Sequence, residues 1–350
     1  MLFKNATVVR LTGDIPVTAE EIEKALAPHK FVPARDMESE KYGWIAPTED
    51  EEDSLVRAQG SVFLLALKVQ KKILPESVIN EELKERLAVR PPHARRIRAK
   101  ERQQMKDEIR FDLLPRAFSK YSRTLGYIDM QRREIVIGTG TSAQVDEFLT
   151  CLRTAFGSLP ATLLEAEYSP QARMTDWARE SSAPPKVQFG EEITLVDPNE
   201  GGSGAFRKQD LTSEEIMQCI ASGKLVQRIG LKWNDYLSFT VDESLVLRKL
   251  APMDMFDKEF EGDDEDNARL DADLFLTVSA LRTLLPELYK WFEVKEAVYT
   301  GSTEAVESFG DDFEIPDSLE DAEYDPAEYE MAPELVENDS YESEEYEAQA

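Results

Sequence analysis

Three short stretches of the chain carry cations in patterns suited to binding a polyanion. The first two lie within residues 90–123, which hold 11 Lys and Arg against four Asp and Glu. Arg95, Arg98 and Arg102 are spaced i, i+3 and i+7, so one face of a helix would present all three side chains. Neutralising DNA phosphates with such a stripe releases counterions. The alternative is a solvated helix whose cations pair with nearby carboxylates, and charge alone does not separate the two.

Basic and aromatic residues alternate directly after this stripe. Arg116, Lys120 and Arg123 are interleaved with Phe118 and Tyr121. An exposed Phe between cations could wedge into a base step while the cations hold the phosphates. The residue pattern by itself favours the alternative that Phe118 packs into a core or against a partner subunit.

The third stretch consists of Arg207, Lys208 and Gln209, which follow the glycine-rich residues 201–204. Glycines give a loop that can approach a nucleic-acid backbone, and Gln209 would add neutral hydrogen bonds to phosphate or sugar. An isolated Arg-Lys pair is more commonly plain surface, which is the alternative here.

Catalytic residues are scarce. His29 and His93 are the only histidines, which leaves little material for a histidine-based triad or a zinc site. The phosphate-loop pattern G-x-x-x-x-G-K-[ST] does not occur. We therefore predict no catalytic residue, no metal and no cofactor.

One acidic cluster leaves a different function open. Residues 263–266 are all acidic, and Asp271 and Asp273 follow closely. Carboxylates can hold Mg²⁺ for phosphodiester hydrolysis, so a metal-dependent nuclease using the cluster near Asp263 is an alternative. Gly262 and the unbroken charge run favour a solvated acidic loop instead.

The net charge of −29 is concentrated at the C-terminal end. Residues 301–350 contain 19 Asp and Glu and no Lys or Arg, so the first 300 residues hold 41 basic and 51 acidic residues, a balance of −10. This composition, without helical periodicity, predicts a disordered acidic tail over 301–350. The tail would compete with DNA for the cations, aid solubility, or recruit basic partners as part of a protein scaffold, a third possible function.

The composition also indicates the cellular compartment. Cys151 and Cys219 are the only cysteines, which gives no disulfide framework and fits a reducing cytoplasm. No apolar run approaches the ~18 residues of a membrane span, and the N-terminal residues lack the pattern of a secretory signal. We expect a cytoplasmic protein without a membrane partner.

Hydrophobic periodicity predicts an α+β fold. Before residue 165 it predicts strands over 3–11, 44–47 and 61–72, a hairpin of 125–130 with 134–138, and helices over 19–26, 75–87, 93–114 and 144–156. Thr18 and Glu21 form a capping box at the start of the first helix. After 165 it predicts a helix from 212 to 220, strands over 225–233, 236–241 and 245–250, and a final helix containing 274–288.

This order of elements predicts a domain interrupted by a projecting subdomain. We expect a central α/β domain formed by residues 1–74 and 124–165, and a basic helical tip formed by 75–123. Residues 166–300 would form a separate base domain, followed by the tail.

Several motifs, in order along residues 1–300, resemble those of the recombination-associated protein RdgC family. They are Phe3-Lys4-Asn5, Gly43-Trp44, Lys71 to Pro75, Leu113 to Phe118, Gly157 to Pro160, Lys208 to Ile216, and Leu270 to Asp273. None is a generic nucleotide or metal motif, so their joint occurrence is specific.

The resemblance implies a homodimer that closes a ring around duplex DNA through tip-to-tip and base-to-base contacts. It also implies binding without sequence preference, restraint of RecA-dependent recombination and strand exchange, association with the nucleoid, and no catalysis. By position in the motifs, Phe118 corresponds to the tip aromatic and Arg95 to a basic residue of the tip helix. Lys208 and Gln209 correspond to base residues associated with DNA.

Overall fold

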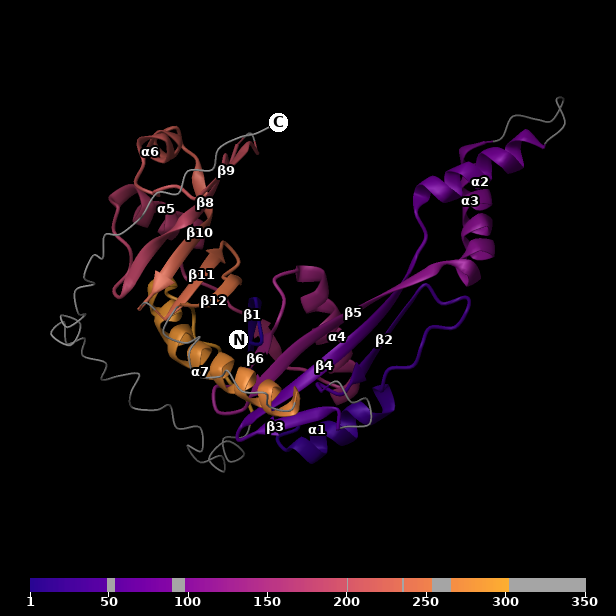
Figure 1. Cartoon of the computed structure of the whole chain (residues 1–350), viewed down its shortest axis with the longest axis horizontal. Coiled ribbons are helices and arrows are strands. Elements are labelled where there is room, and N and C mark those ends of the chain that lie inside the picture. The colour runs from indigo at the N-terminus through magenta and orange to yellow at the C-terminus, as the bar shows by residue number, and fades with distance from the viewer. Residues whose placement is uncertain (49–53, 90–97, 200, 235, 254–265, 302–350) are drawn as a thin grey trace, which may run out of the picture. The chain divides into compact units, whose positions relative to one another are not determined.

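The computed structural model describes residues 1–48, 54–89, 98–199, 201–234, 236–253 and 266–301 (Figure 1). Within these ranges the chain is mixed α+β, with seven α-helices and one twelve-stranded sheet in which every strand pairing is antiparallel. The α+β prediction is therefore confirmed. Arg95, the acidic residues 263–265 and residues 302–350 of the predicted tail lie outside the described residues.

The sheet is continuous along the path β2-β4-β5-β6-β1-β12-β11-β10-β8-β9, with β3 added to β4 and β7 added to β1. The strands are β1 (Asn5–Leu11), β2 (Glu40–Ile45), β3 (Val56–Gln59), β4 (Val62–Ile73), β5 (Phe118–Asp129), β6 (Glu134–Ile137), β7 (Ala161–Leu163), β8 (Val187–Val196), β9 (Ser203–Arg207), β10 (Leu225–Trp233), β11 (Leu237–Asp242) and β12 (Leu247–Pro252). The central strand β1 joins the N-terminal strands to those that follow residue 165, because it pairs with both β6 and β12.

The helices match most of the predicted ones. They are α1 (Ala19–Leu26), α2 (Glu76–Ala88), α3 (Ala99–Leu113), α4 (Ser142–Phe156), α5 (Pro170–Glu180), α6 (Glu214–Ala221) and α7 (Asp266–Phe292), with the 3-10 turns η1 (Ala27–His29) and η2 (Leu114–Arg116). The capping box of Thr18 and Glu21 is present at the start of α1, as predicted. In the described part, no helix is both long and apolar enough to cross a membrane.

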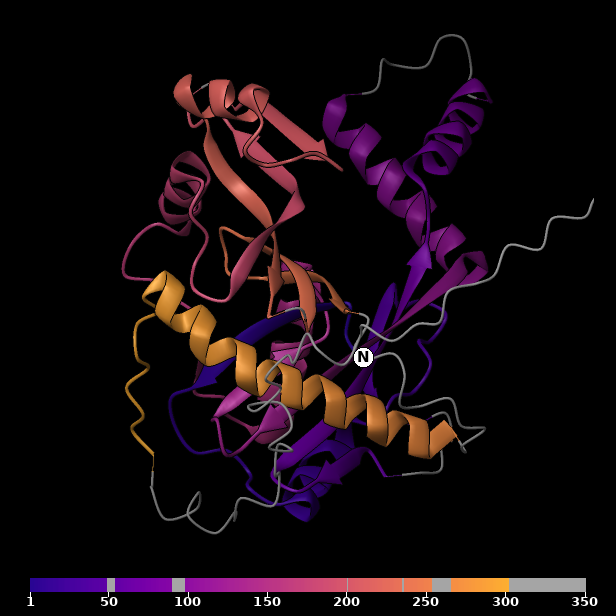
Figure 2. The ribbon, with the colours of Figure 1, turned by 60° about the vertical axis from the view of Figure 1, so that its left-hand side comes forward.

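Strand β4 shows why this part of the sheet is buried on both faces. Alternate residues of a strand point to opposite faces. Val62 and Leu64 belong to one core cluster, while Phe63, Leu65 and Leu67 belong to the other. Helices α1 and α4 cover the second face, and α7 packs on the first (Figure 2). The continuous apolar run in the sequence is the signature of such a strand.

Helix α7 is tied to the sheet by a buried ion pair. The Arg282 guanidinium donates to both carboxylate oxygens of Asp129, at 2.7 and 2.9 Å, and to the Ser61 hydroxyl at 2.9 Å. The side chains of Arg282 and Asp129 are 5% and 3% exposed. We call Arg282, Asp129 and Ser61 the α7 junction. A pair this deeply buried holds the helix in register, because separating the charges would leave one of them unpaired in the interior.

A proline inside α7 creates a second link to the sheet. Pro286 lacks the N–H that would otherwise bond to the Arg282 carbonyl one turn earlier. The Arg132 guanidinium donates to that carbonyl instead, at 3.1 Å. Arg132 lies in the turn between β5 and β6. The turn therefore holds α7 at the point where Pro286 interrupts the hydrogen bonds of the helix.

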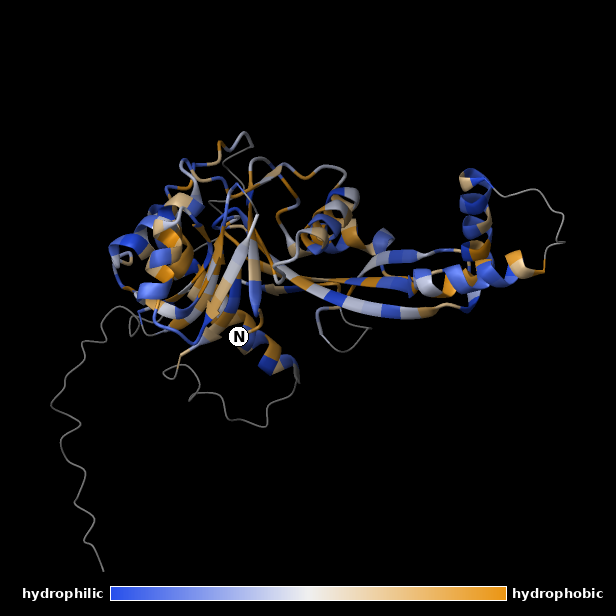
Figure 3. Ribbon diagram, turned by 90° about the horizontal axis from the view of Figure 1, so that it is seen from above, coloured by the Kyte–Doolittle hydropathy of each residue, from blue (hydrophilic) through white to orange (hydrophobic). Residues whose placement is uncertain are grey.

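The tip (residues 75–123) sits at the end of the β4–β5 pair. The two strands stay in register as far as Ile73 opposite Phe118. The prediction that β5 begins near 125 is wrong, because it begins at Phe118 and crosses the expected domain boundary without a break. The division into three domains stays a prediction. Among the described residues, the buried core between α2 and α3 consists of Ile79, Leu83 and Ile109, with Leu74, Leu87, Met105 and Leu113 partly buried against it. Figure 3 shows these helices to be largely hydrophilic.

Candidate nucleic-acid interface

The basic stripe on α3 divides into two halves. Arg98, at the N-cap, and Lys100 and Arg102, in the first turn, are exposed and make no salt bridge within the part of the chain that the structure describes. Lys106 and Arg110, farther along the helix, both contact Glu76 of α2, and the Lys106–Glu76 distance is 3.5 Å. The ion-pair alternative is therefore confirmed for the later cations, which hold the tip together. The earlier cations face solvent, and DNA contact by them stays a prediction.

The two cations of the paired half lower the pKa of Glu76. A hydrogen bond from Arg110, followed by the charges of Arg110 and Lys106, holds the pKa of this carboxyl below its ordinary value. Glu76 is therefore ionised at neutral pH and neutralises part of the tip's positive charge. The cations available to an external polyanion are those at the other end of α3.

Phe118 is a surface residue. It opens β5 directly after η2, and its side chain is 85% exposed. The interpretation of Phe118 as a residue of the chain's own core is wrong. Tyr121, also on β5, is 52% exposed. A phenyl ring exposed to this extent contributes little to the subunit's own core and is accessible to a partner or ligand.

Strand alternation separates the cations predicted around Phe118. Phe118 and Lys120 point to one face of β5, and Arg123 to the other. Lys120 and Arg116, in η2, are exposed and make no salt bridge among the described residues. Arg123 instead donates to the backbone carbonyl of Pro47. The structure thus places Lys120 on the same face of β5 as Phe118, with Arg116 exposed two residues before the strand, and binds Arg123 to the loop after β2.

Strand β4 adds three lysines that the sequence analysis did not predict as part of the site. Lys71 lies opposite Lys120, and Lys68 opposite Arg123, in the β4–β5 register. Lys71 pairs with Glu147 of α4, and Lys72 donates to the carbonyls of Asp36 and Leu114. The Lys68 ammonium lies 5.9 Å from the Tyr121 ring centre. These residues were missed because only the antiparallel register brings them beside residues 118–123.

The third predicted stretch lies at the end of the edge strand β9. Gly201, at φ +71°, turns the chain between β8 and β9. Arg207 ends β9, and Lys208 follows in the left-handed region at φ 54°. Both side chains are exposed and make no salt bridge with the described residues. Gln209 is half-buried, and its amide donates to Glu215 at 3.2 Å.

The described carboxylates give no support to a metal site. No group of three or more His, Cys, Asp or Glu side chains in the described ranges is placed to hold a metal. Of the acidic residues named above, Asp271 accepts from Arg57 at 2.9 and 2.5 Å, and Asp273 accepts from the N-terminal amine of Met1 at 3.0 Å. These two carboxylates already have cationic partners, and residues 263–265 lie outside the described residues.

The described chain is an α+β protein with unpaired cations gathered on the tip and at the end of β9. The family model described as "Putative exonuclease, RdgC" matches residues 1–295. The chain belongs to the RdgC family.

Relatives match over nearly their whole length. A recombination-associated protein RdgC of Halorhodospira halophila is 36% identical over 302 residues, which cover 85% of this chain and 99% of the relative. The proteins of the same name from Pseudomonas syringae pv. syringae and Pseudomonas aeruginosa are 36% and 35% identical over 295 residues, which cover 83% of this chain and 96% of each relative.

Proposed function

We propose that this chain is a non-enzymatic protein that binds duplex DNA without sequence preference and acts in recombination. The observation that carries the proposal is the set of exposed cations of the tip that make no salt bridge among the residues the structure describes. Arg98, Arg102, Arg116 and Lys120 belong to this set. Contacts from such side chains to phosphate, through charge and hydrogen bonds, do not depend on the base sequence, which gives affinity without specificity.

The protein acts as a homodimer that closes around the duplex through tip-to-tip and base-to-base contacts. Apolar residues that are exposed on the described part of the tip support the first contact, because a partner could cover them. They are Val78, Val89, Phe111 and Phe118. Phe118 serves at this contact or as a wedge between base pairs, and the two uses are compatible with its exposure.

The role in recombination is supported by the family and by the names of the relatives. A clamp that occupies duplex DNA impedes the recombinase filament and strand exchange, so the protein restrains RecA-dependent recombination from the nucleoid. The mechanism is electrostatic and topological. It needs no bond to be made or broken, and no metal or cofactor.

The proposal is tested by measuring the binding of two unrelated duplexes to the full chain across a salt series. Log K should fall linearly with log salt, with a slope of about 0.9 for each phosphate neutralised, and the two duplexes should bind alike. Replacing Arg98, Arg102 and Lys120 by Ala should weaken binding to both duplexes and lower the slope by up to about 2.7, or about 0.9 for each cation.

A matched control replaces Lys41, Arg179 and Lys290, which lie outside the tip and each pair with a carboxylate three residues away. This variant should bind as the unchanged protein does. Equal losses in the two triple variants would show that net charge, and not the tip, governs binding. Cleavage of the duplex on adding Mg²⁺ would establish the nuclease alternative. Failure to bind duplex DNA would favour the alternative of a protein scaffold whose acidic tail recruits basic partners.

A further inference from the structure

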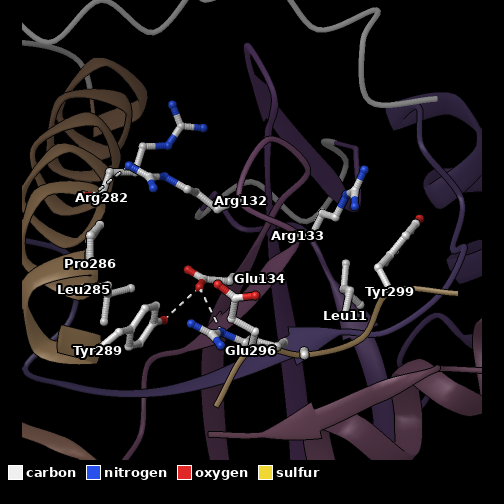
Figure 4. Close-up of a pocket in the computed structure, with 12 residues that line it drawn as sticks. Leu11, Arg132, Arg133, Glu134, Arg282, Leu285, Pro286, Tyr289, Glu296 and Tyr299 are labelled. Carbon is white, nitrogen blue, oxygen red and sulfur yellow. Dashed lines mark hydrogen bonds and ion pairs between the residues drawn. The ribbon is translucent and has the colours of Figure 1, made fainter. Parts of the chain in front are cut away.

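The arginines next to α7 each contact another part of the chain. Figure 4 shows this region, where the Arg10 side chain lies 3.7 Å from the Glu134 carboxylate. Arg132 extends toward α7 and donates to one of its backbone carbonyls at 3.1 Å, and Arg133 lies 3.9 Å from the centre of the Tyr299 ring. These contacts serve the fold, because each joins two different segments of the chain.

Two arginines of the strands β9 and β10 have no such partner among the described residues. Arg207 ends β9, and its exposed side chain makes no hydrogen bond or salt bridge within the described ranges. Arg228 of β10 is half-buried, and its Nε is buried without a hydrogen-bond partner there. A buried N–H without an acceptor destabilises a protein, so it points to an acceptor that comes from outside the chain.

Both arginines point to the face of the sheet opposite α5 and α6. Phe206 and Ile229, which are their neighbours in β9 and β10, pack in the core cluster that these two helices share with the sheet. Because successive residues of a strand point to opposite faces, Arg207 and Arg228 lie on the other face. Figure 1 shows α5 and α6 together on one side of β8, β9 and β10.

The carboxylates nearest to the two arginines on this face are already neutralised. In the strand register, Glu192 of β8 lies opposite Arg207, and Asp242 of β11 lies opposite Arg228. Their partners are instead cations of β12, Lys249 at 2.6 Å from Glu192 and Arg248 at 2.8 Å from Asp242. The positive charges of Arg207 and Arg228 are therefore not cancelled by these two neighbours.

Small side chains separate the two arginines. Thr194 of β8 lies opposite Arg228 on one side and opposite Ala205 of β9 on the other. Neighbouring strands are about 4.8 Å apart, so β9 and β10, with β8 between them, are about 10 Å apart. The two guanidinium groups would therefore contact separate phosphates. Separated cations with small residues between them suit the backbone of a polynucleotide, which presents its phosphates in series.

We propose that Arg207 and Arg228 form a second phosphate-binding surface, on the face of β8, β9 and β10 opposite α5 and α6, and that it contacts the backbone of duplex DNA. The inference rests on the proposed function, because the ligand is the same duplex. It extends the DNA site from the tip and the end of β9 onto the sheet itself. Binding draws the Arg228 side chain outward, so that its Nε gains a phosphate oxygen as acceptor.

The test is duplex binding by the full chain across a salt series. Arg228→Gln should weaken binding by about tenfold and lower the slope of log K against log salt by about 0.9, because one cation is lost. Arg228→Lys should keep the slope and weaken binding less, since it keeps the charge and loses the planar fork. Arg207→Gln changes an exposed side chain and should also lower the slope by about 0.9, which decides the matter if Arg228→Gln does not fold.

The control is Arg179→Gln, which removes a cation of α5 that pairs with Asp176 on the helix-covered side of the sheet. Its salt slope should match that of the unchanged protein. An unchanged slope in a folded Arg228→Gln or in Arg207→Gln would overturn the second surface and leave the proposed function in place. An equal fall in Arg179→Gln would overturn it as well, because net charge would then be the cause.

Two further outcomes are separated by the same samples. No duplex binding by the unchanged protein would overturn the proposed function and the second surface together. Sedimentation of the free proteins reports subunit assembly. If Arg228→Gln alters assembly while its salt slope stays unchanged, this face belongs to a contact between subunits, and the DNA contact is overturned.

Discussion

Charged side chains are buried and paired in the α7 junction, whereas several in the tip are exposed and unpaired among the described residues. In the junction, Arg282 and Asp129 are almost fully buried and satisfy each other. In the tip, Arg98 and Arg102 are exposed without salt bridges among the described residues, beside a core of three side chains. Charges in the junction fix the relation of a helix to the sheet. These two arginines make no salt bridge that would stabilise the fold, unlike Lys106 and Arg110 farther along α3, which is why we propose a ligand for them.

The apolar residues show the same contrast. Helix α7 buries a row of leucines completely, including Leu274, Leu281 and Leu288. The tip exposes Val89 at 87% and Phe118 at 85%. Exposed apolar side chains of this size would be covered by the tip-to-tip contact that we propose. The buried apolar residues of α7 instead stabilise the subunit itself.

The largest effect is expected from breaking the α7 junction. Arg282→Ala leaves the Asp129 carboxylate buried without its partner, and should lower the free energy of unfolding by about 3–5 kcal/mol. The measurement is urea denaturation. The control is Arg57→Ala, whose salt bridge with Asp271 is one-third exposed and should contribute less than about 1 kcal/mol. Equal losses in the two variants would contradict the role of the junction.

The next effect should be confined to the tip. Ile109→Ala removes a fully buried member of its three-residue core, a change that typically costs about 2–5 kcal/mol. With so little other core, α2 and α3 should lose hydrogen-exchange protection while the sheet keeps its own. Phe111→Ala, two residues away and 59% exposed, should leave the exchange unchanged. Loss of protection in the sheet as well would show that the tip is not an independent unit of stability.

These contacts also show what the sequence can and cannot predict. The capping box of Thr18 and Glu21 was predictable because its partners are three residues apart. The pairing of Arg282 with Asp129 spans 153 residues, and that of Arg110 with Glu76 spans 34. No periodicity encodes such partners, so charge counts could not tell which cations of the tip remain unpaired. The start of β5 was missed for the same reason, because Phe118 is a strand residue only by its pairing with Ile73.

A smaller effect should separate the two kinds of side chain on one face of β5. Phe118→Ala should change the free energy of unfolding by less than about 0.5 kcal/mol, because the ring is already exposed. It should weaken duplex binding without changing the salt slope, since no charge is lost. Lys120→Ala, two residues along the same face, should lower the slope by about 0.9. Identical salt slopes for the two variants would remove Lys120 from the phosphate contacts.

The smallest effect is expected at the end of β9, from a single cation in a strained position. Lys208 adopts φ 54°, a conformation that glycine accepts more readily than lysine. Lys208→Gly should therefore keep the fold intact, while the salt slope of duplex binding falls by about 0.9 for the missing cation. The matched control is Lys186→Gly, because Lys186 is also exposed, also left-handed at φ 62°, and also without a salt bridge among the described residues. It lies before β8, outside the predicted site, and its loss should leave the slope unchanged.

Adding Gln209→Ala to Lys208→Gly should weaken binding further with no additional change of slope, because the amide carries no charge. A slope that falls equally in the Lys186 and Lys208 variants would show a diffuse effect of charge, and binding would then belong to the tip alone.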